Sequence, residues 1–250
     1  MVTAIVLAAG IGSRMQSDTA KQFMKIGAHE VLFYSLNTFQ KHALIDEIVL
    51  VTKPEFVAHC KDEIVNKYGF SKVKHICEGG KERYNSVYNG LKCINEERKC
   101  ARGEDCGENE DIVMIHDGAR PFVTDAMITQ SILCAKTCGA CTVGVPAKDT
   151  IKIVDEEQYG RETPERSHVY QIQTPQTFKM DLLLTAYEKM FFESEKQADR
   201  YKITDDTMLV EQYSGVCCKV VDGAYENIKI TTPEDLEIAE IFAQKSLQKN

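Results

Sequence analysis

Short apolar runs rich in β-branched residues alternate along the chain with longer segments in which apolar residues recur every three or four positions. The short runs predict strands and the longer segments predict helices. The predicted strands are Ala4–Leu7, Glu47–Thr52, Val73–Glu78, Ile112–Ile115 and Thr142–Pro146, and the predicted helices are Val31–Lys41, Phe56–Tyr68, Asn85–Asn95 and Asp125–Cys138. This alternation is typical of an α/β fold, with a doubly wound, mostly parallel sheet covered by helices.

The chain has 250 residues, of which 43% are hydrophobic, so it can bury a full core. We therefore expect one domain spanning residues 1–250. Ligands of doubly wound sheets bind beyond the carboxyl ends of the strands. The loops that follow the predicted strands are consequently where we expect the chemistry.

A polar, extended segment from Asp149 to Gln173 departs from this alternation. Two β-like stretches, Thr150–Val154 and Val169–Gln173, flank a charged middle and predict a projecting hairpin or arm at about residues 148–173. A lone two-stranded hairpin is only marginally stable in water, so an arm of this kind is expected to pack on another subunit. The segment therefore predicts a dimer.

Three further polar stretches carry structural predictions. Asn95–Asp111 is charged and almost free of large apolar residues, which predicts a surface excursion between a helix and a strand. Thr204 is followed by two acidic residues, which fits a helix N-cap better than a second metal site. Thr232 and Pro233 have the residue types expected at the start of the last helix.

Charge and cysteine content narrow the classes of function. The net charge of −8 disfavours a broad surface for nucleic acid or anionic membrane. No apolar run approaches the roughly 18 residues of a membrane span. The ten cysteines, in a chain without a signal-peptide pattern, predict reduced thiols and a cytoplasmic protein. Cys134, Cys138 and Cys141 lack a fourth ligand at zinc-site spacing and fit packed thiols better than a metal site.

A glycine-rich loop, LAAGIGSRM at residues 7–15, directly follows the first predicted strand and precedes Lys21-Gln22-Phe23. Small residues and two glycines let backbone N–H groups approach a polyphosphate closely, and Arg14 and Lys21 add positive charge. The spacing matches neither the Walker pattern nor the dinucleotide fingerprint. The glycines alone fit an ordinary strand-to-helix turn equally well, but the two cations favour a phosphate-binding loop.

A second motif, His116-Asp117-Gly118-Ala119-Arg120-Pro121, also follows a predicted strand and so falls at the same edge of the sheet. Mg²⁺ bound to phosphates takes one or two protein carboxylates, so Asp117 is a candidate ligand. Arg120 is a candidate phosphate contact. The alternative is a turn in which Asp117 and Gly118 serve the backbone geometry. His116 is expected to pack or to form hydrogen bonds.

The stretch GGKERYNSVYNGL lies between these two motifs, and they are followed in order by VPAKDTIK, QTPQTF, TDDTMLVE and YENIKITTPEDL. With this set, from residue 7 to residue 236, the chain resembles the 2-C-methyl-D-erythritol 4-phosphate cytidylyltransferase family. The resemblance implies a Rossmann-like fold and a reaction of CTP with methylerythritol phosphate that releases pyrophosphate, in the non-mevalonate route to isoprenoids. It also implies Mg²⁺ or another hard divalent cation, and a homodimer in which each arm completes the neighbour's site.

The resemblance further implies roles for individual residues. Those implied for catalysis are Arg14, Lys21 and Lys229. Those implied for nucleotide binding are Ala8, Ala9, Gly10, Gly12, Ser13, Gly80, Arg83, Ser86, Asp117 and Gly118, with Asp117 also a metal ligand. Those implied for the polyol phosphate are Arg120, Thr150, Arg166, Thr174 and Thr204, with Thr150 and Arg166 offered by the neighbouring subunit. The chain departs from the family at Ala20, where proline is usual, and at Lys81, where an acidic residue is common.

Two other functions fit part of this pattern. A cytidylyltransferase for ribitol 5-phosphate, or a related pentitol phosphate, would share the loop and the QTPQTF motif, but KDTIK and HDGARP resemble the methylerythritol family. A non-catalytic nucleotide-binding dimer would be expected to lose Arg14, Lys21 or Asp117, and all three are present. A nicotinamide oxidoreductase is disfavoured because the dinucleotide fingerprint is incomplete.

Overall fold

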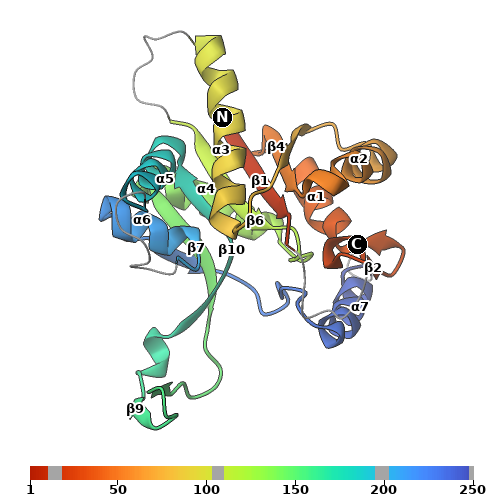
Figure 1. Ribbon diagram of the computed structural model, residues 1–250. Helices are drawn as coiled ribbons and strands as arrows, with labels where there is room; N and C mark the ends of the chain where they lie inside the picture. The colour runs from red at the N-terminus through yellow and green to blue at the C-terminus, as the bar shows by residue number, and fades with distance from the viewer. Residues whose placement is uncertain (11–18, 103–109, 195–202, 248–250) are drawn as a thin grey trace.

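The computed structural model describes residues 1–10, 19–102, 110–194 and 203–247, and its centre is one seven-stranded sheet (Figure 1). The strand order is β11-β7-β10-β6-β1-β4-β5. The strands of this sheet are β1 (Val2–Ala8), β4 (Glu47–Thr52), β5 (Val73–Glu78), β6 (Ile112–Asp117), β7 (Ala140–Pro146), β10 (Tyr170–Lys179) and β11 (Lys219–Asp222). A short hairpin of β2 (Lys25–Ile26) and β3 (His29–Glu30) stands apart from it.

The sheet is mostly parallel, which confirms the predicted fold class. Strand β1 runs parallel to β4 on one side and to β6 on the other, and β10 alone runs antiparallel to its neighbours β6 and β7. The strand order reverses between β1 and β6, and such a reversal marks the ligand-binding crevice of open α/β sheets. Leu7 pairs with Asp117 at the carboxyl ends of these two strands, so both predicted motifs leave the sheet at this point.

Two of the predicted helices, α1 and α4, have the predicted bounds, and two differ from the prediction. The helices are α1 (Val31–Lys41), α2 (Val57–His59), α3 (Arg83–Arg102), α4 (Asp125–Cys138), α5 (Met180–Ser194), α6 (Asp206–Ser214) and α7 (Pro233–Leu247). The segment predicted as one helix at 56–68 begins with a 3₁₀ turn and continues after α2 as a π-helix, Cys60–Asn66. Helix α3 extends into the charged stretch predicted as an excursion, because its Glu, Arg and Lys residues are good helix formers.

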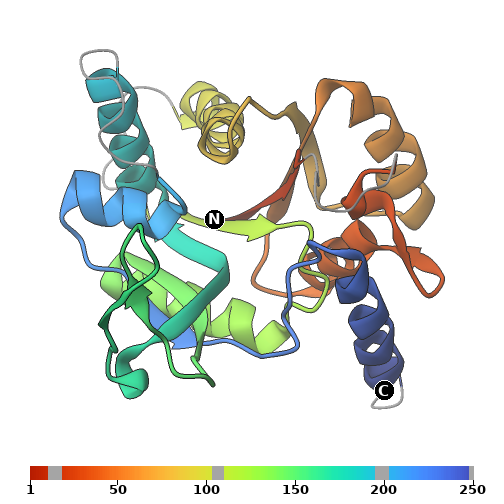
Figure 2. The same ribbon diagram turned by 60° about the horizontal axis from the view of Figure 1, so that its bottom comes forward.

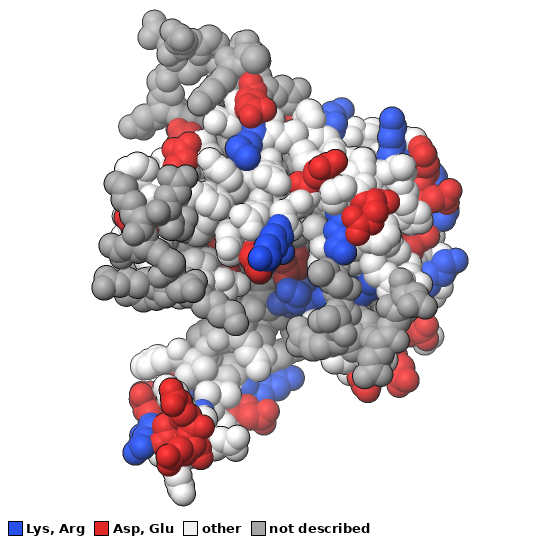
Figure 3. Space-filling view, in the orientation of Figure 1, with Lys and Arg blue, Asp and Glu red and all other residues white. Residues whose placement is uncertain are grey.

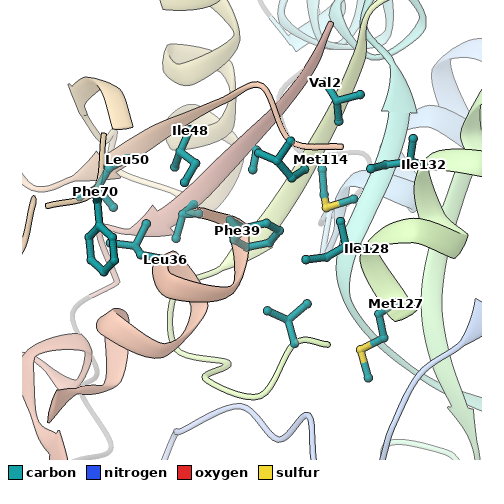
Figure 4. Packing of buried hydrophobic residues seen from close by; sticks show 14 of the residues in the cluster. Val2, Leu36, Phe39, Ile48, Leu50, Phe70, Met114, Met127, Ile128 and Ile132 are labelled. Atoms are coloured by element: carbon teal, nitrogen blue, oxygen red, sulfur yellow. The ribbon is translucent and has the colours of Figure 1, made fainter. Parts of the chain in front are cut away.

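Alternate residues of each strand face opposite helical layers, as the strand period of two requires. Ala4 and Val6 of β1 pack with α1 and α4, whereas Ile5 packs with α3, α5 and α6 on the other face. Figure 2 shows helices on both sides of the sheet, and Figure 4 shows Phe39 and Met114 within the first of these layers. Each such apolar side chain contributes ~1.5–3 kcal/mol when it is fully buried.

The arm is present, but one of its two predicted strands was assigned wrongly. Figure 1 shows the segment around β9 projecting away from the body. The hairpin consists of β8 (Ile153–Val154) and β9 (Gly160–Glu162). The stretch predicted at Val169–Gln173 instead forms the beginning of β10, which pairs with β7 in the central sheet. The apolar residues of this stretch therefore belong to the sheet, and the part that projects contains the hairpin of β8 and β9.

The start of α6 corrects a second prediction. Asp205, and not Thr204, is the N-cap residue, and its side chain accepts a hydrogen bond from the backbone N–H of Met208. The last helix starts at Pro233 as predicted, with Asp235 accepting hydrogen bonds from the backbone N–H groups of Thr231 and Thr232. Across the parts of the chain that the structure describes, no helix is both long and apolar enough to cross a membrane.

Eight cysteines carry free thiols, as predicted, and these are Cys60, Cys77, Cys93, Cys134, Cys138, Cys141, Cys217 and Cys218. Cys141 is buried on β7, where its thiol donates to the carbonyl of Ser131, while Cys134 is half-buried and Cys138 is exposed on α4. Burial raises the pKa of the Cys60 thiol to about 11, so this thiol is neutral at physiological pH. These thiols pack as small apolar groups.

Candidate functional site

Asp117, at the carboxyl end of β6, is surrounded by three basic side chains, two of which come from distant segments of the chain. Lys229 Nζ lies 2.7 Å from Asp117 Oδ2, and Arg83 Nε lies 3.4 Å from Oδ1. Arg120 Nε lies 4.0 Å from Oδ2. Figure 3 shows Lys and Arg side chains meeting acidic ones in a hollow between the body and the arm. The fold therefore brings together the candidates Arg83, Asp117, Arg120 and Lys229.

The surrounding cations control the protonation of Asp117. Burial alone would raise the pKa of this carboxyl, but Arg83 and Lys229 hold it well below its usual range. The carboxylate is therefore ionised throughout the physiological pH range. The three basic groups around it outnumber its single charge, so the cluster can attract an anion such as a polyphosphate.

Arg83 has a second acidic partner, Asp206, which is 1% exposed at the start of α6. Arg83 Nη1 lies 2.7 Å from Asp206 Oδ2, and the hydroxyl of Tyr187 donates a hydrogen bond to Asp206 Oδ1. Burial would lower the pKa of Arg83, but Asp206 and Asp117 raise it above its ordinary value. Arg83 is thus held between two carboxylates.

Asn227 fixes the segment that carries Lys229. Its side-chain amide is buried and donates to the carbonyl of Thr174 and to the side chain of Gln173. The backbone carbonyl of Asn227 accepts a hydrogen bond of 2.8 Å from Arg120 Nη1. Lys229 is two residues further along, so its ammonium group is directed at Asp117 by contacts made at Asn227.

Thr174 and His116 form hydrogen bonds that hold the backbone of the cluster in place. Thr174 lies on β10 where the pairing with β7 shifts register, and its hydroxyl accepts from the backbone N–H of Asp117 at 3.0 Å. The same oxygen lies 3.1 Å from Nδ1 of His116, whose Nε2 lies 3.0 Å from the carbonyl of Arg120. Burial lowers the pKa of His116 to about 4, so its ring is neutral at pH 7. His116 forms hydrogen bonds, as predicted.

The first loop leaves β1 beside this cluster. Gln22 is buried and donates a hydrogen bond of 2.7 Å to the carbonyl of Ala8, which ties Lys21-Gln22-Phe23 to the loop. A Cβ placed on Gly10 would lie 4.0 Å from Cε of Lys21, so the lysine side chain passes over the described start of the loop. Ala8, Ala9, Gly10 and Lys21 are therefore close together. Gly12, Ser13 and Arg14 lie outside the described residues.

The Gly79-Gly80 pair lies against the first loop. A Cβ on Gly79 would come within 2.6 Å of the Cβ of Ala9, so only glycine permits this approach. Ser86 accepts a hydrogen bond from the backbone N–H of Gly80 and donates one to the carbonyl of Glu82. Gly118 is packed equally closely, because its Cβ would meet the carbonyl of Leu7 at 3.0 Å. Among the described candidates, Ala9 and the Gly79-Gly80 pair are thus adjacent, and Gly118 lies beside the end of β1.

The cluster around Asp117 does not include Thr150, Arg166 or Thr204. Thr150 and Arg166 are exposed on the arm, where Arg166 Nη1 donates to the carbonyl of Lys148. Thr204 is exposed before α6, and its hydroxyl donates to the sulfur of Met208. The arm also exposes large apolar side chains, which are Ile151, Ile153, Val154, Tyr159, Tyr170 and Ile172.

The sequence predictions missed three residues of the site. Gln22, Asp206 and Asn227 each have a buried polar side chain that holds a candidate residue in position. Each lies within a motif quoted above, as the Q of KQF, the second D of TDDT and the N of YENIKI. Their roles depend on partners about 14 to more than 100 positions away in sequence, which no local pattern contains.

Comparisons with known proteins show which family this chain is similar to. The family model described as 2-C-methyl-D-erythritol 4-phosphate cytidylyltransferase matches residues 2–245. A protein of that name from Clostridioides difficile is 46% identical over 240 residues, which are 96% of this chain and 92% of the relative. One from Clostridium botulinum is 44% identical over 241 residues, or 96% of each chain.

Solved structures with the same fold carry equivalent names. The crystal structure of 4-diphosphocytidyl-2C-methyl-D-erythritol synthase from Anaerococcus prevotii superposes with a TM-score of 0.78 at 34% identity, covering 97% of this chain and 96% of that one. The 2-C-methyl-D-erythritol 4-phosphate cytidylyltransferase of Francisella tularensis has a TM-score of 0.73 at 29% identity and covers 96% and 98%.

Proposed function

The chain belongs to the 2-C-methyl-D-erythritol 4-phosphate cytidylyltransferase family, a family of nucleotidyltransferases, and we propose how its own residues carry out the family's reaction. In that reaction a phosphate oxygen of methylerythritol phosphate attacks the α-phosphorus of CTP. The bond from the α-phosphorus to the bridging oxygen breaks, and pyrophosphate leaves. The products are 4-diphosphocytidyl-2-C-methyl-D-erythritol and pyrophosphate. The names of the relatives do not favour a pentitol phosphate as the acceptor.

Positioning and electrostatics carry the catalysis in this proposal. A phosphate monoester is already a nucleophile, so the enzyme must mainly bring two anions together. We assign the triphosphate to Ala8, Ala9, Gly10, Gly12 and Ser13, and the developing charge at the α-phosphorus to Arg14, Lys21 and Lys229. We assign the cytidine and ribose to Gly80, Arg83, Ser86, Asp117 and Gly118. The observation that carries this proposal is the cluster of Arg83, Arg120 and Lys229 around Asp117, beside the first loop.

A divalent cation fits the site through Asp117. The described residues contain no group of three or more His, Cys, Asp or Glu side chains placed to hold a metal by themselves. A hard cation that keeps phosphate and water ligands needs only one or two carboxylates, and Asp117 is one that stays ionised. Lys229 and Arg83 contact its two oxygens, so the ion would share or displace these contacts. When bound, Mg²⁺ would neutralise charge on the phosphates.

The acceptor site is proposed to form between two subunits. Arg120, Thr174 and Thr204 would come from one subunit, and Thr150 and Arg166 from the arm of its neighbour. The exposed apolar side chains of the arm, among them Ile153, Val154 and Tyr159, support this arrangement, because several large apolar residues exposed on one projecting segment are typical of an interaction site. Arg166 would then bind the phosphate of the polyol from across the interface.

Complementation between two inactive variants tests the shared site. Co-expressed chains carrying Lys21→Ala and Arg166→Ala would assemble into mixed dimers, in which one site combines an intact body with an intact arm. With random pairing, turnover is expected to recover to about a quarter of the wild-type value. Each variant alone is expected to be nearly inactive, as measured by pyrophosphate release. No recovery in purified mixed dimers would show that each arm serves its own subunit.

Two further properties complete the proposal. Residues 1–250 would act as one nucleotidyltransferase domain from which the arm projects. The free thiols of the described segments suit a reducing compartment, which supports a cytoplasmic location.

A further inference from the structure

Asp206 is a buried carboxylate to which the proposed reaction assigns no direct role. It is 1% exposed, and three groups hold it in place. The hydroxyl of Tyr187 donates to its Oδ1, the backbone N–H of Asp206 donates to the side chain of Gln176, and Arg83 Nη1 lies 2.7 Å from its Oδ2. A buried carboxylate is costly unless it is paired, so its partner Arg83 is the first place to look for its purpose.

The position of Asp206 in its helix does not explain the carboxylate. Asp205, the preceding residue, is the N-cap of α6 and accepts the hydrogen bond from the backbone N–H of Met208. Asp205 also accepts hydrogen bonds from the side chains of Gln176 and Thr207. The start of the helix is thus already capped, and the side chain of Asp206 turns away to meet Arg83.

Arg83 is held from two sides, and part of it reaches the site. Its Nη1 is on Asp206, and its Nε lies 3.4 Å from Oδ1 of Asp117. The side chain is 28% exposed, whereas that of Asp206 is 1% exposed. Asp206 therefore lies behind the guanidinium group, which leaves the exposed part of Arg83 for a ligand. A guanidinium fixed in this way loses little rotational freedom when a nucleotide binds.

We propose that Asp206 is a positioning residue for nucleotide binding, which holds the Arg83 guanidinium in one orientation at the edge of the CTP site. The proposal rests on the assignment of Arg83 to the nucleotide. Without the charge of Asp206, the remaining acidic partner of Arg83 among the described residues is Asp117, at the longer distance of 3.4 Å, and the guanidinium is free to sample several rotamers. Ordering such a side chain again opposes the binding of the ligand that it contacts. This cost would fall on CTP binding and not on the chemical step.

Steady-state kinetics of Asp206→Asn test the proposal. The KM for CTP is expected to rise about 3- to 10-fold, while kcat and the KM for methylerythritol phosphate change less than about twofold. The matched control is Asp205→Asn, which removes the neighbouring carboxylate but keeps a good N-cap residue, and its kinetics should equal those of the wild type. A general loss of folding would not raise one KM selectively. An unchanged KM for CTP in folded Asp206→Asn overturns the proposal.

A double-mutant cycle with Arg83→Met separates this proposal from the assignment on which it rests. If Asp206 acts through Arg83, adding Asp206→Asn to Arg83→Met should leave the KM for CTP unchanged within about twofold. This double variant removes both charges and leaves no unpaired buried charge, so its KM can be measured even if Asp206→Asn alone does not fold. A further rise in KM would show that Asp206 acts independently of Arg83 and would overturn the proposal. A normal KM for CTP in Arg83→Met would refute the assignment of Arg83, and the positioning role with it.

Discussion

Replacing Lys21 with alanine is expected to lower kcat roughly 10²-fold or more while the protein remains folded. Two unit charges about 4 Å apart repel by ~4 kcal/mol at an effective dielectric constant of about 20, which opposes the approach of two phosphates. The side chain of Lys21 passes over Gly10, at the loop assigned to the triphosphate. Its removal leaves this repulsion and the charge developing at the α-phosphorus uncompensated. The same loss is expected for Arg14→Ala.

Lys25 provides a matched control for Lys21. It is an exposed lysine four positions further along, on β2. Lys25→Ala should retain wild-type kcat, as measured by pyrophosphate release with saturating CTP and methylerythritol phosphate. Circular dichroism and thermal unfolding would establish that both variants are folded. If folded Lys21→Ala turned over at a near-normal rate, the assignment of Lys21 to the reacting phosphates would be wrong.

Replacing Asp117 with asparagine is expected to lower kcat/KM for CTP by roughly 10²-fold, because preorganised charge at the reacting phosphates is lost. The change removes the proposed metal ligand and the carboxylate that orients Lys229 at 2.7 Å. It also removes the negative charge between Arg83 and Lys229, so the free energy of unfolding should fall by ~2 kcal/mol. Lys229 is partly exposed, and solvent screening keeps this loss below that of a fully buried pair.

Asp111 allows the two effects of Asp117→Asn to be separated. Asp111 directly precedes strand β6 and Asp117 ends it, so the two residues lie at opposite ends of the strand, and both are buried. Asp111 pairs with the N-terminal amine at 2.7 Å, away from the site. Asp111→Asn should therefore lower stability in urea titrations without lowering kcat. A kcat/KM for Asp117→Asn within threefold of the wild type, about 0.7 kcal/mol, would contradict the role given to Asp117.

The sheet could be predicted because its signals are local. The strand Glu47–Thr52 is a buried run rich in β-branched residues, Val73–Glu78 is a partly buried strand at the end of the sheet, and the observed bounds of both equal the predicted ones. The order of strands then places Ala8 and Asp117 at one edge, since parallel strands end on the same side. The edge of the sheet that carries the candidate site could therefore be predicted from the sequence.

The errors occurred where tertiary partners decide the structure. Val169–Gln173 has the composition of a strand, but its partner is β7 in the central sheet and not the other half of the arm. Asp205 and Asp206 have identical side chains, yet one caps α6 and the other pairs with Arg83. Adjacent identical residues cannot be distinguished by composition or by helix periodicity. The contact of Asn227 with Arg120 spans 107 positions, so it could not be predicted from a local sequence pattern either.

Pyrophosphate release by the purified protein with CTP and Mg²⁺, with methylerythritol phosphate and ribitol 5-phosphate compared as acceptors, tests the central claim most directly. The account predicts a large preference for methylerythritol phosphate in kcat/KM. A preference for ribitol 5-phosphate would keep the roles of Lys21 and Asp117 but contradict the acceptor. Folded protein that released pyrophosphate with neither acceptor would contradict the assignment as a cytidylyltransferase of this pathway.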